Sequence, residues 1–248
     1  MPSAAAVEVV HGLRAGLAVF SRRRDEIVRV AYARGVRGDV AALARWATSR
    51  HIPCAEVTEQ ELERLAGSAQ NEGLCVLTKS RRWLSARELG DVLRRARGAA
   101  LALDRVRNPY NVGALLRSAA FFGVDAVLLG APAPHSGLAP TAVRVAEGGA
   151  EHLGLCRTTD LATTLARLRE HGIHVVGAEG SATTSAIGYA FPRPAVIVVG
   201  NEREGLGERI RSACDALVAV PGSGAMQSLN VAVAGGILMA QLMRARDS

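Results

Sequence analysis

Three segments of this 248-residue chain place polar side chains directly after short apolar runs. In the first, the run 99–103 is short enough for a buried strand, and a polar turn leads from it into a segment of helical periodicity. Asn111 is placed to cap that helix, and Arg117 lies nearly two turns into it. Open α/β sheets hold ligands at such strand-to-helix turns. For this segment taken alone, a capping Asn and a solvated Arg remain an equal alternative.

Two further segments repeat this arrangement. The run 195–199 is a β-rich strand that leads into an acidic loop flanked by glycines, with Glu202 inside it. The run 217–220 leads into a Gly/Pro loop and then a helix that opens with Ser-Leu-Asn at 228–230. Because glycine permits positive φ, these loops let a ligand approach the backbone closely. Three such joints in one chain predict a polar functional site.

The apolar runs also predict an α/β fold. From residue 99 onward strands and helices alternate, which favours a mainly parallel sheet with helices on both faces. Its strands are expected at Ala99–Leu103, Val124–Leu129, Ile173–Val176, Ala195–Val199 and Leu217–Val220. A smaller α/β module precedes it, with helices expected at Gly12–Phe20, Val40–Ser49 and Glu59–Ala66, and strands at Ile27–Ala31, 52–57 and Cys75–Leu77.

The chain is expected to divide near residues 79–98. Ser85 and Glu88 have the spacing of a capping box, which predicts a basic linker helix that ends near Arg97 with Gly98 as its stop. The expected domains are therefore 1–78, a linker at 79–98, and 99–248. At the other end, the helix Asn230–Arg244 is apolar nearly all round, which predicts burial on more than one face.

The formal net charge of +7 is concentrated in the first part of the chain. Residues 1–98 hold 17 basic and 11 acidic residues, whereas residues 99–248 hold 13 and 12. The basic residues cluster at Arg22-Arg23-Arg24, Arg81-Arg82 and Arg94-Arg95-Ala96-Arg97. Two interpretations stay open, phosphate binding and a merely solvated basic surface.

Several other classes of protein do not fit. The four cysteines are scattered without metal-ligand spacing, which favours reduced thiols in a cytosolic compartment and no metal site. No apolar run approaches the ~18 residues of a membrane span. The only lysine, Lys79, stands outside any P-loop pattern, and Gly222-Ser-Gly224 lacks the third glycine of a dinucleotide-binding fingerprint.

Together, the Asn…Arg, Gly-x-Glu and Ser-Leu-Asn segments resemble the motifs of the SpoU (TrmH-type) RNA ribose methyltransferases of the SPOUT class. Their order and separation make the signal specific, and the resemblance covers the whole chain. The runs 108–111, 146–152 and 224–230 look most like a poorly characterised bacterial subgroup. One departure is Val220-Pro221-Gly222, where the family often has Ile-Pro-Met; it removes a side chain beside the cofactor loop and leaves the backbone contacts.

The resemblance implies a fold and partners that the pattern of residues does not reach. It implies a deep trefoil knot in the C-terminal domain and an N-terminal RNA-binding domain related to ribosomal protein L30e, for which an accessory dimerisation module is the alternative. It further implies S-adenosylmethionine (SAM) as cofactor, tRNA or rRNA as partner, and a homodimer through the knot region in the cytoplasm. No membrane or DNA partner is expected.

The resemblance also implies a chemistry, methyl transfer from SAM to a ribose 2′-hydroxyl. Because a guanidinium is a poor base at neutral pH, we expect Arg117 to hold a phosphate and stabilise the developing oxyanion. His152 is expected to be a loop or supporting residue rather than a base. The implied catalytic residues are Asn111, Arg117, Glu202, Ser228 and Asn230, and the implied cofactor contacts are backbone groups of Gly200, Val220 and Leu229. A non-catalytic RNA-binding or ribosome-assembly factor is the alternative function.

Overall fold

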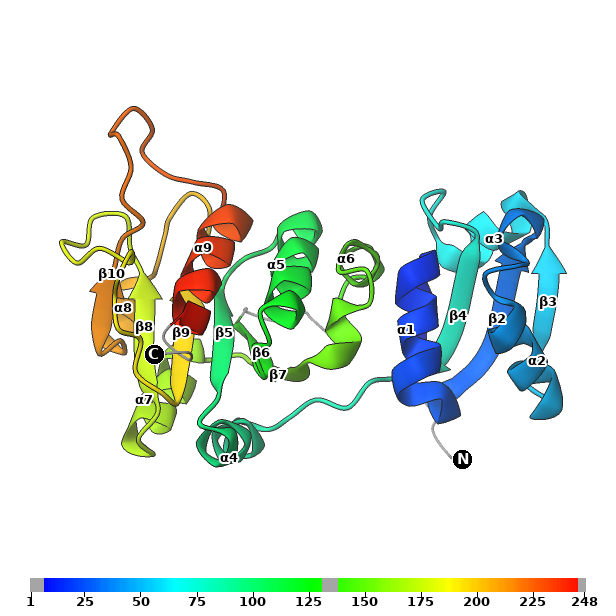
Figure 1. The fold of residues 1–248 in the computed structure, drawn as a ribbon, viewed down its shortest axis with the longest axis horizontal. Helices are drawn as coiled ribbons and strands as arrows, with labels where there is room; N and C mark the ends of the chain where they lie inside the picture. Colours follow the sequence, from blue (N-terminus) through cyan, green and yellow to red (C-terminus); the bar gives the residue numbers. More distant parts are fainter. Residues whose placement is uncertain (1–6, 131–137, 245–248) are drawn as a thin grey trace. The chain divides into compact units, whose positions relative to one another are not determined.

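The structure, a computed structural model, describes residues 7–130 and 138–244. Its contacts divide the chain into two compact units (Figure 1). Unit 1 holds the described residues up to 82 together with 138–152, and unit 2 holds the described residues 83–130 and 153–244. The expected boundary near 79–98 thus falls at 82, and a segment from the second half of the chain belongs to unit 1.

Unit 1 is a four-stranded sheet in the order β1-β4-β2-β3 with helices on both faces. The pairs β1–β4 and β2–β4 are antiparallel, and β2–β3 is parallel. Helices α1 and α2 pack on one face, and α3 packs on the other around Leu62 and Ala66. Its elements are β1 (Val7–His11), α1 (Leu13–Arg23), β2 (Ile27–Ala33), α2 (Ala41–Ser49), β3 (Cys54–Val57), α3 (Glu59–Ala66), β4 (Leu74–Lys79), α6 (Pro140–Val145) and the short helix η3 (Gly149–His152).

The segment 138–152 is part of the packed body of unit 1. Val143 lies in the same buried cluster as Val10 and Val19, from β1 and α1. Gly148 allows η3 to approach α1 closely, because a Cβ added there would stand 2.6 Å from the Cβ of Ala18. Its φ of 91° also lies in the region that favours glycine. The close approach therefore depends on this glycine.

Unit 2 is a six-stranded parallel sheet in the order β10-β8-β9-β5-β6-β7. Parallel strands with near-continuous apolar sequences are buried on both faces, and β5 and β9 are buried along their whole length. Its elements are α4 (Ala86–Ala96), β5 (Ala99–Asp104), α5 (Pro109–Phe121), β6 (Ala126–Gly130), β7 (Gly154–Thr158), α7 (Leu161–Glu170), β8 (His174–Ala178), β9 (Ala195–Val199), α8 (Glu208–Ser212), β10 (Ala216–Val218) and α9 (Val231–Arg244).

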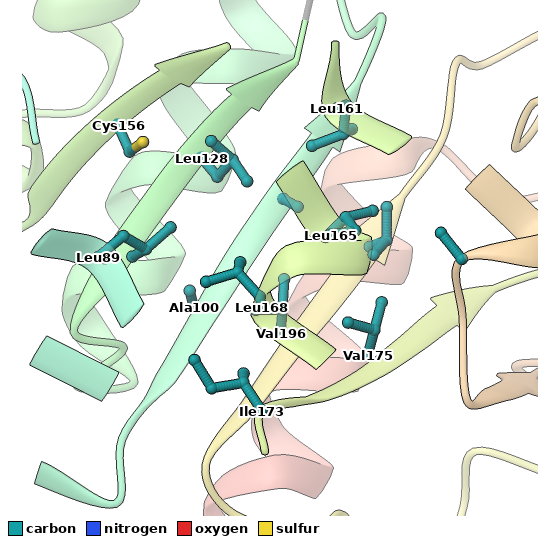
Figure 2. Close-up of a cluster of buried hydrophobic side chains, with 14 of the residues drawn as sticks. Leu89, Ala100, Leu128, Cys156, Leu161, Leu165, Leu168, Ile173, Val175 and Val196 are labelled. Carbon is teal, nitrogen blue, oxygen red and sulfur yellow. The ribbon is translucent and has the colours of Figure 1, made fainter. Parts of the chain in front are cut away.

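The helices of unit 2 lie in two layers. Helices α5 and α9 pack side by side, against β6 and β9 respectively (Figure 1). Helices α4, α7 and α8 pack on the main hydrophobic core, where Leu89, Leu165 and Leu168 meet the sheet residues Leu128 and Val196 (Figure 2). The mainly parallel sheet predicted from the sequence is confirmed. The sheet carries the carboxyl ends of β5, β9 and β10 to one edge, where the predicted polar residues follow.

Two sequence expectations differ from the structure. Helix α4 does begin at the predicted capping box, with Ser85 and Glu88 bonded reciprocally, but it buries Leu89 and Leu93 in the core of unit 2 rather than serving as a free linker. Helix α9 buries a single stripe, formed by Val231, Gly235, Leu238, Met239 and Leu242. Val233 on another face is 51% exposed. The prediction that α9 is buried on more than one face is therefore not met within one chain.

Candidate active site

The first turn of α5 places Asn111 at the edge of the sheet. Asn108 caps the helix, its side chain accepting a hydrogen bond from the Tyr110 amide at 2.9 Å, and Pro109 occupies the first helical position. The prediction that Asn111 caps this helix is therefore wrong. Proline favours the first helical position, which leaves the cap to the residue before it and frees the Asn111 side chain for other partners.

Glu202 lies in a tight turn after β9. The Gly205 amide donates to the Asn201 carbonyl at 2.9 Å, which closes the turn. The chain returns so closely that a Cβ added at Gly200 would stand 2.4 Å from the carbonyl carbon of Gly205. No side chain fits at Gly200 without moving backbone, so this glycine is required for the geometry of the turn. Glu202 projects from a fixed backbone.

Hydrogen bonds join this turn to α5 and α9. The Asn111 Nδ2 group donates to Glu202 Oε1 at 2.6 Å, and the Asn230 Nδ2 group donates to Asn111 Oδ1 at 3.0 Å. Asn230 Oδ1 also accepts from the Ala232 amide at 2.8 Å, at the start of α9. We call Glu202, Asn111 and Asn230 the amide chain. It brings together three predicted residues that are 91 and 119 positions apart in sequence.

The other predicted site residues lie outside the amide chain, in the same unit. Arg117 is exposed on α5, six residues beyond Asn111 and hence about 9 Å along the helix axis. Ser228 is exposed in the loop that leads to Asn230 and is not a member of the amide chain. Of the predicted cofactor contacts, Gly200 and Val220 are partly buried, and Leu229 is 49% exposed. All of them lie in unit 2.

Two residues of the same edge escaped the sequence analysis, Asp104 and Arg105. Asp104 ends β5 with only 4% of its surface exposed, and its carboxylate accepts from the Gly207 amide at 3.2 Å. Arg105 has a φ of 56°, unusual for a residue with a side chain. An aspartate at the end of an apolar strand was the available signal, but the bonds of Asp104 to Gly207 and of Arg105 to Gly205 join residues about 100 positions apart.

A bordering cavity of about 440 Å³ opens near the ends of β5, β6 and β7. Its lining includes Asp104, Arg105, Thr159, Asp160 and Arg209. Asp160 caps α7 and accepts from Arg209 Nη2 at 3.1 Å. Hydrogen bonds to Thr163 and then to Arg209 lower the pKa of Asp160. Two of the acidic groups that line this cavity, Asp104 and Asp160, are thus already paired with Arg105 and Arg209.

Three residues that the sequence analysis singled out serve unit 1 instead. Arg23 and Arg81, members of two predicted basic clusters, are only 11% and 7% exposed and both contact Glu151. They are therefore neither phosphate-facing nor solvated. His152 pairs through Nδ1 with Arg22 at 2.8 Å, in the short helix η3. It lies in a different unit from the amide chain.

The described parts of the chain hold neither a metal-ligand cluster nor a membrane-spanning helix. Within residues 7–130 and 138–244, no three His, Cys, Asp or Glu side chains are grouped so that they could hold a metal ion. No described helix combines the length and hydropathy needed to cross a membrane. All four cysteines are free, and burial raises the pKa of Cys75 and of Cys156 to about 11.

Comparison with known proteins gives the family. The SpoU rRNA Methylase family matches residues 98–240. A 23S rRNA (guanosine-2′-O-)-methyltransferase RlmB from Vibrio vulnificus is 32% identical over 244 residues, covering 96% of this chain and 97% of that protein. The RlmB protein of Photorhabdus laumondii is 34% identical over 245 residues, covering 97% and 99%. The chain belongs to the SpoU rRNA methylase family.

Solved structures support the same fold. The SpoU methyltransferase AviRb from Streptomyces viridochromogenes, in complex with the cofactor AdoMet, has a TM-score of 0.79 at 20% identity, covering 97% of this chain and 91% of that one. An AdoMet-bound rRNA methyltransferase from Sinorhizobium meliloti has a TM-score of 0.78 at 22% identity, covering 96% and 87%. Both units therefore follow an arrangement of elements found in experimental structures of this kind.

Proposed function

We propose that this chain is a SAM-dependent RNA methyltransferase that modifies the 2′-hydroxyl of a guanosine ribose in large-subunit ribosomal RNA. The observation that carries the proposal is the amide chain, which links the carboxyl edge of the sheet to two helices through Glu202, Asn111 and Asn230. The full-length relatives named as 23S rRNA guanosine methyltransferases support the choice of RNA and nucleotide.

The loops around the amide chain suit a SAM molecule. A Cβ added at Gly222 or Gly224 would meet nothing within 4 Å, so the backbone of this loop is open to a ligand. Leu229 and Met226, 49% and 80% exposed, offer apolar surface for an adenine ring. Backbone groups of Gly200, Val220 and Leu229 would hold the cofactor, as the family resemblance implies. When bound, SAM supplies a methyl group on a sulfonium, which is already a good leaving group.

The protein's part in this chemistry is orientation and charge stabilisation. Asn111, fixed between Glu202 and Asn230, would hold the ribose in line with the methyl group, and orientation contributes much of the rate of such a displacement. Arg117 would grip a neighbouring phosphate and stabilise the charge that develops on the 2′-oxygen. A phosphate or a water would then accept the proton. Ser228 would contact the substrate from the loop that leads to Asn230.

Unit 1 would bind the RNA, as the N-terminal L30e-like domain expected from the sequence. With Arg23 and Arg81 withdrawn into ion pairs, the exposed cations available to phosphates include Arg24, Arg29 and Arg45. Free cysteines and the absence of a spanning helix among the described residues are compatible with the proposed cytoplasmic location. The trefoil knot likewise remains part of the proposal, carried by membership of the family.

A homodimer through the knot region completes the proposal. The neighbouring helices α5 and α9 each expose a large apolar side chain, Phe121 (83%) at the end of α5 and Val233 (51%) near the start of α9. A two-fold dimer would use this pair of helices on both subunits. Gly236 on α9 has open space around it, so Gly236→Arg should fold yet block a helix of the partner. We expect this variant to lose both association and methylation; a fully active monomer in light scattering would refute the dimer.

The function is tested with full-length protein, SAM carrying a labelled methyl group, and ribosomal RNA from a strain that lacks this protein. The expected result is a single labelled guanosine that resists alkaline cleavage, because a 2′-O-methyl group removes the attacking hydroxyl. Calorimetry with SAM separates the alternatives. RNA binding without SAM binding would indicate the non-catalytic RNA-binding factor instead.

A further inference from the structure

The turn that carries Glu202 is organised by its neighbour Asn201. The side-chain Oδ1 of Asn201 accepts from the amides of Arg203 and Glu204, at 3.0 and 3.2 Å. Its backbone carbonyl accepts from Gly205 at 2.9 Å. Three successive amides of the turn are therefore bonded to one residue, which is how an Asn side chain replaces a backbone turn partner.

The side-chain NH2 group of Asn201 attaches this turn to the end of β5. Its Nδ2 group donates to the backbone carbonyl of Arg105 at 3.1 Å. Arg105 still continues the sheet on its amide side, donating to Gly130 at 2.9 Å. Its φ of 56° breaks the extended conformation at this residue, so its carbonyl bonds the turn instead of a neighbouring strand. The hydrogen bond from Asn201 to the Arg105 carbonyl therefore depends on the left-handed backbone of Arg105.

The Arg105 side chain makes a second attachment. Its guanidinium pairs with Asp104 through Nε and Nη2, at 3.2 and 3.1 Å, and through Nη1 with Glu204. Nη2 also donates to the Gly205 carbonyl at 3.3 Å. Hydrogen bonds to Asp104 raise the pKa of Arg105, so it stays charged. This attachment reaches the far side of the turn, beyond Glu202.

We propose that Asn201 is a positioning residue of the methyl transfer, which it serves by bracing the Glu202 turn against the end of β5 so that Glu202 holds Asn111. The inference rests on the proposed function, because it acts through the amide chain. Asparagine suits this position because it donates and accepts at once. Aspartate of the same size would keep the acceptor and lose the donor.

The test compares Asn201→Asp with a matched control from the same turn, Arg203→Ala, in full-length protein. Asn201→Asp loses the bond to Arg105 but keeps the acceptors of the turn. Arg203→Ala removes an exposed side chain and keeps the backbone amide that Asn201 Oδ1 accepts from. We expect Asn201→Asp to lower kcat about 100-fold with the KM for RNA and the melting temperature near wild type. Arg203→Ala should keep the kcat of the wild type. Equal rates for Asn201→Asp and wild type would overturn the proposal.

A double-mutant cycle with Glu202→Gln shows whether Asn201 acts through Glu202. If it does, adding Asn201→Asp to Glu202→Gln costs little further rate, whereas independent losses that multiply would overturn the inference. A Glu202→Gln enzyme as fast as wild type would overturn the assigned site as well. Should Asn201→Asp fail to fold, Asn201→Ser keeps an oxygen for the turn but cannot reach Arg105. It is expected to show the same loss of kcat.

Discussion

The molecule holds two polar clusters of opposite design. In unit 1, Glu8, Arg23, Arg81 and Glu151 form a buried ion cluster, in which Glu151 is 3% exposed and contacts both arginines; Glu26, 38% exposed, pairs with Arg23 at its rim. Although burial alone would lower the pKa of Arg23, the Glu151 carboxylate raises it. In unit 2, the amide chain ends at the exposed Asn230.

This difference distinguishes a cluster that stabilises the fold from one that can bind a substrate. A buried charge is tolerated only when protein partners satisfy it, and in the ion cluster the buried carboxylates and guanidiniums bind one another. The amide chain is neutral apart from Glu202 and ends at solvent, where a ribose can complete it. Clustered charge in a sequence therefore does not by itself locate a nucleic-acid site, as Arg23 and Arg81 demonstrate.

The largest expected effect comes from opening the ion cluster. Glu151→Ala leaves Arg23 and Arg81 buried without their shared carboxylate, and should lower the free energy of unfolding of unit 1 by about 3–5 kcal/mol. Glu147→Ala is the control from the same segment. Arg14, with which Glu147 forms an ion pair, is 69% exposed, so the loss of this pair should cost about 0–1 kcal/mol.

The measurement is fluorescence-monitored urea unfolding in a Trp83→Phe background. This leaves Trp46 as the only tryptophan, in contact with Phe20 of α1 at 5.4 Å between ring centroids and with the ring planes tilted by 56°. Equal losses for Glu151→Ala and Glu147→Ala would contradict the distinction between buried and exposed pairs. SAM affinity of the folded variants should not change.

Breaking the amide chain should lower the rate of methyl transfer and leave the stability nearly unchanged, the reverse of opening the ion cluster. Asn111→Ala removes the link between Glu202 and Asn230, and should lower the rate of methyl transfer about 100-fold with little loss of stability. Asn108→Ser is the control, because serine also caps a helix and the substitution leaves Asn111 in place. Single-turnover kinetics with labelled SAM measure both. A large loss in the control and none in Asn111→Ala would reverse our assignment of the two asparagines.

A smaller effect is expected from pH, through the buried His11 of unit 1. Burial lowers the pKa of His11 from 6.5, and Arg144 lowers it further against the opposing effects of Gln70 and Glu72. The unfolded chain therefore binds a proton at a higher pH than the folded protein does. Stability is complete above about pH 6.5 and declines below it. His11→Gln should flatten this decline in Trp46 fluorescence, and an unchanged slope would argue against the buried histidine as its cause.

The smallest effect should be a gain. Arg97 follows α4 with a φ of 46° and is exposed. Glycine adopts this conformation without the steric cost of a Cβ. Arg97→Gly should therefore raise the free energy of unfolding by about 0.5–1 kcal/mol, and the melting temperature should rise with it. The rate of methyl transfer should not change. A destabilised variant would show that the Arg97 side chain contributes contacts worth more than the backbone strain.

Local signals predicted much of the fold. The helix Glu59–Ala66 and the strand Ala195–Val199 match their predicted bounds, because capping residues, a terminal glycine and β-branched runs act within a few residues. Strands β1 and β7 were missed, since each is a five-residue stretch of mixed polarity that depends on its neighbours in the sheet. The place of residues 138–152 in unit 1 arises from packing between distant segments, which no local pattern contains.

The site divides in the same way. Glu202, Asn111 and Asn230 could be chosen because each follows a recognisable strand-to-loop joint. That Asn108 rather than Asn111 caps α5 was within reach, since the proline after it favours the first helical position. The brace between Asn201 and Arg105 was not, because it joins a side chain to a carbonyl 96 residues away and depends on one left-handed residue.

The place of the segment 138–152 in unit 1 also has a consequence for synthesis. A ribosome releases the chain from its amino end, so Glu8, Arg23 and Arg81 emerge well before Glu151, which follows Arg81 by 70 residues. Until Glu151 emerges, Arg23 and Arg81 lack the carboxylate that they share in the folded unit 1. The first unit to leave the ribosome therefore cannot mature independently, and must wait until translation has passed through β6 of the second.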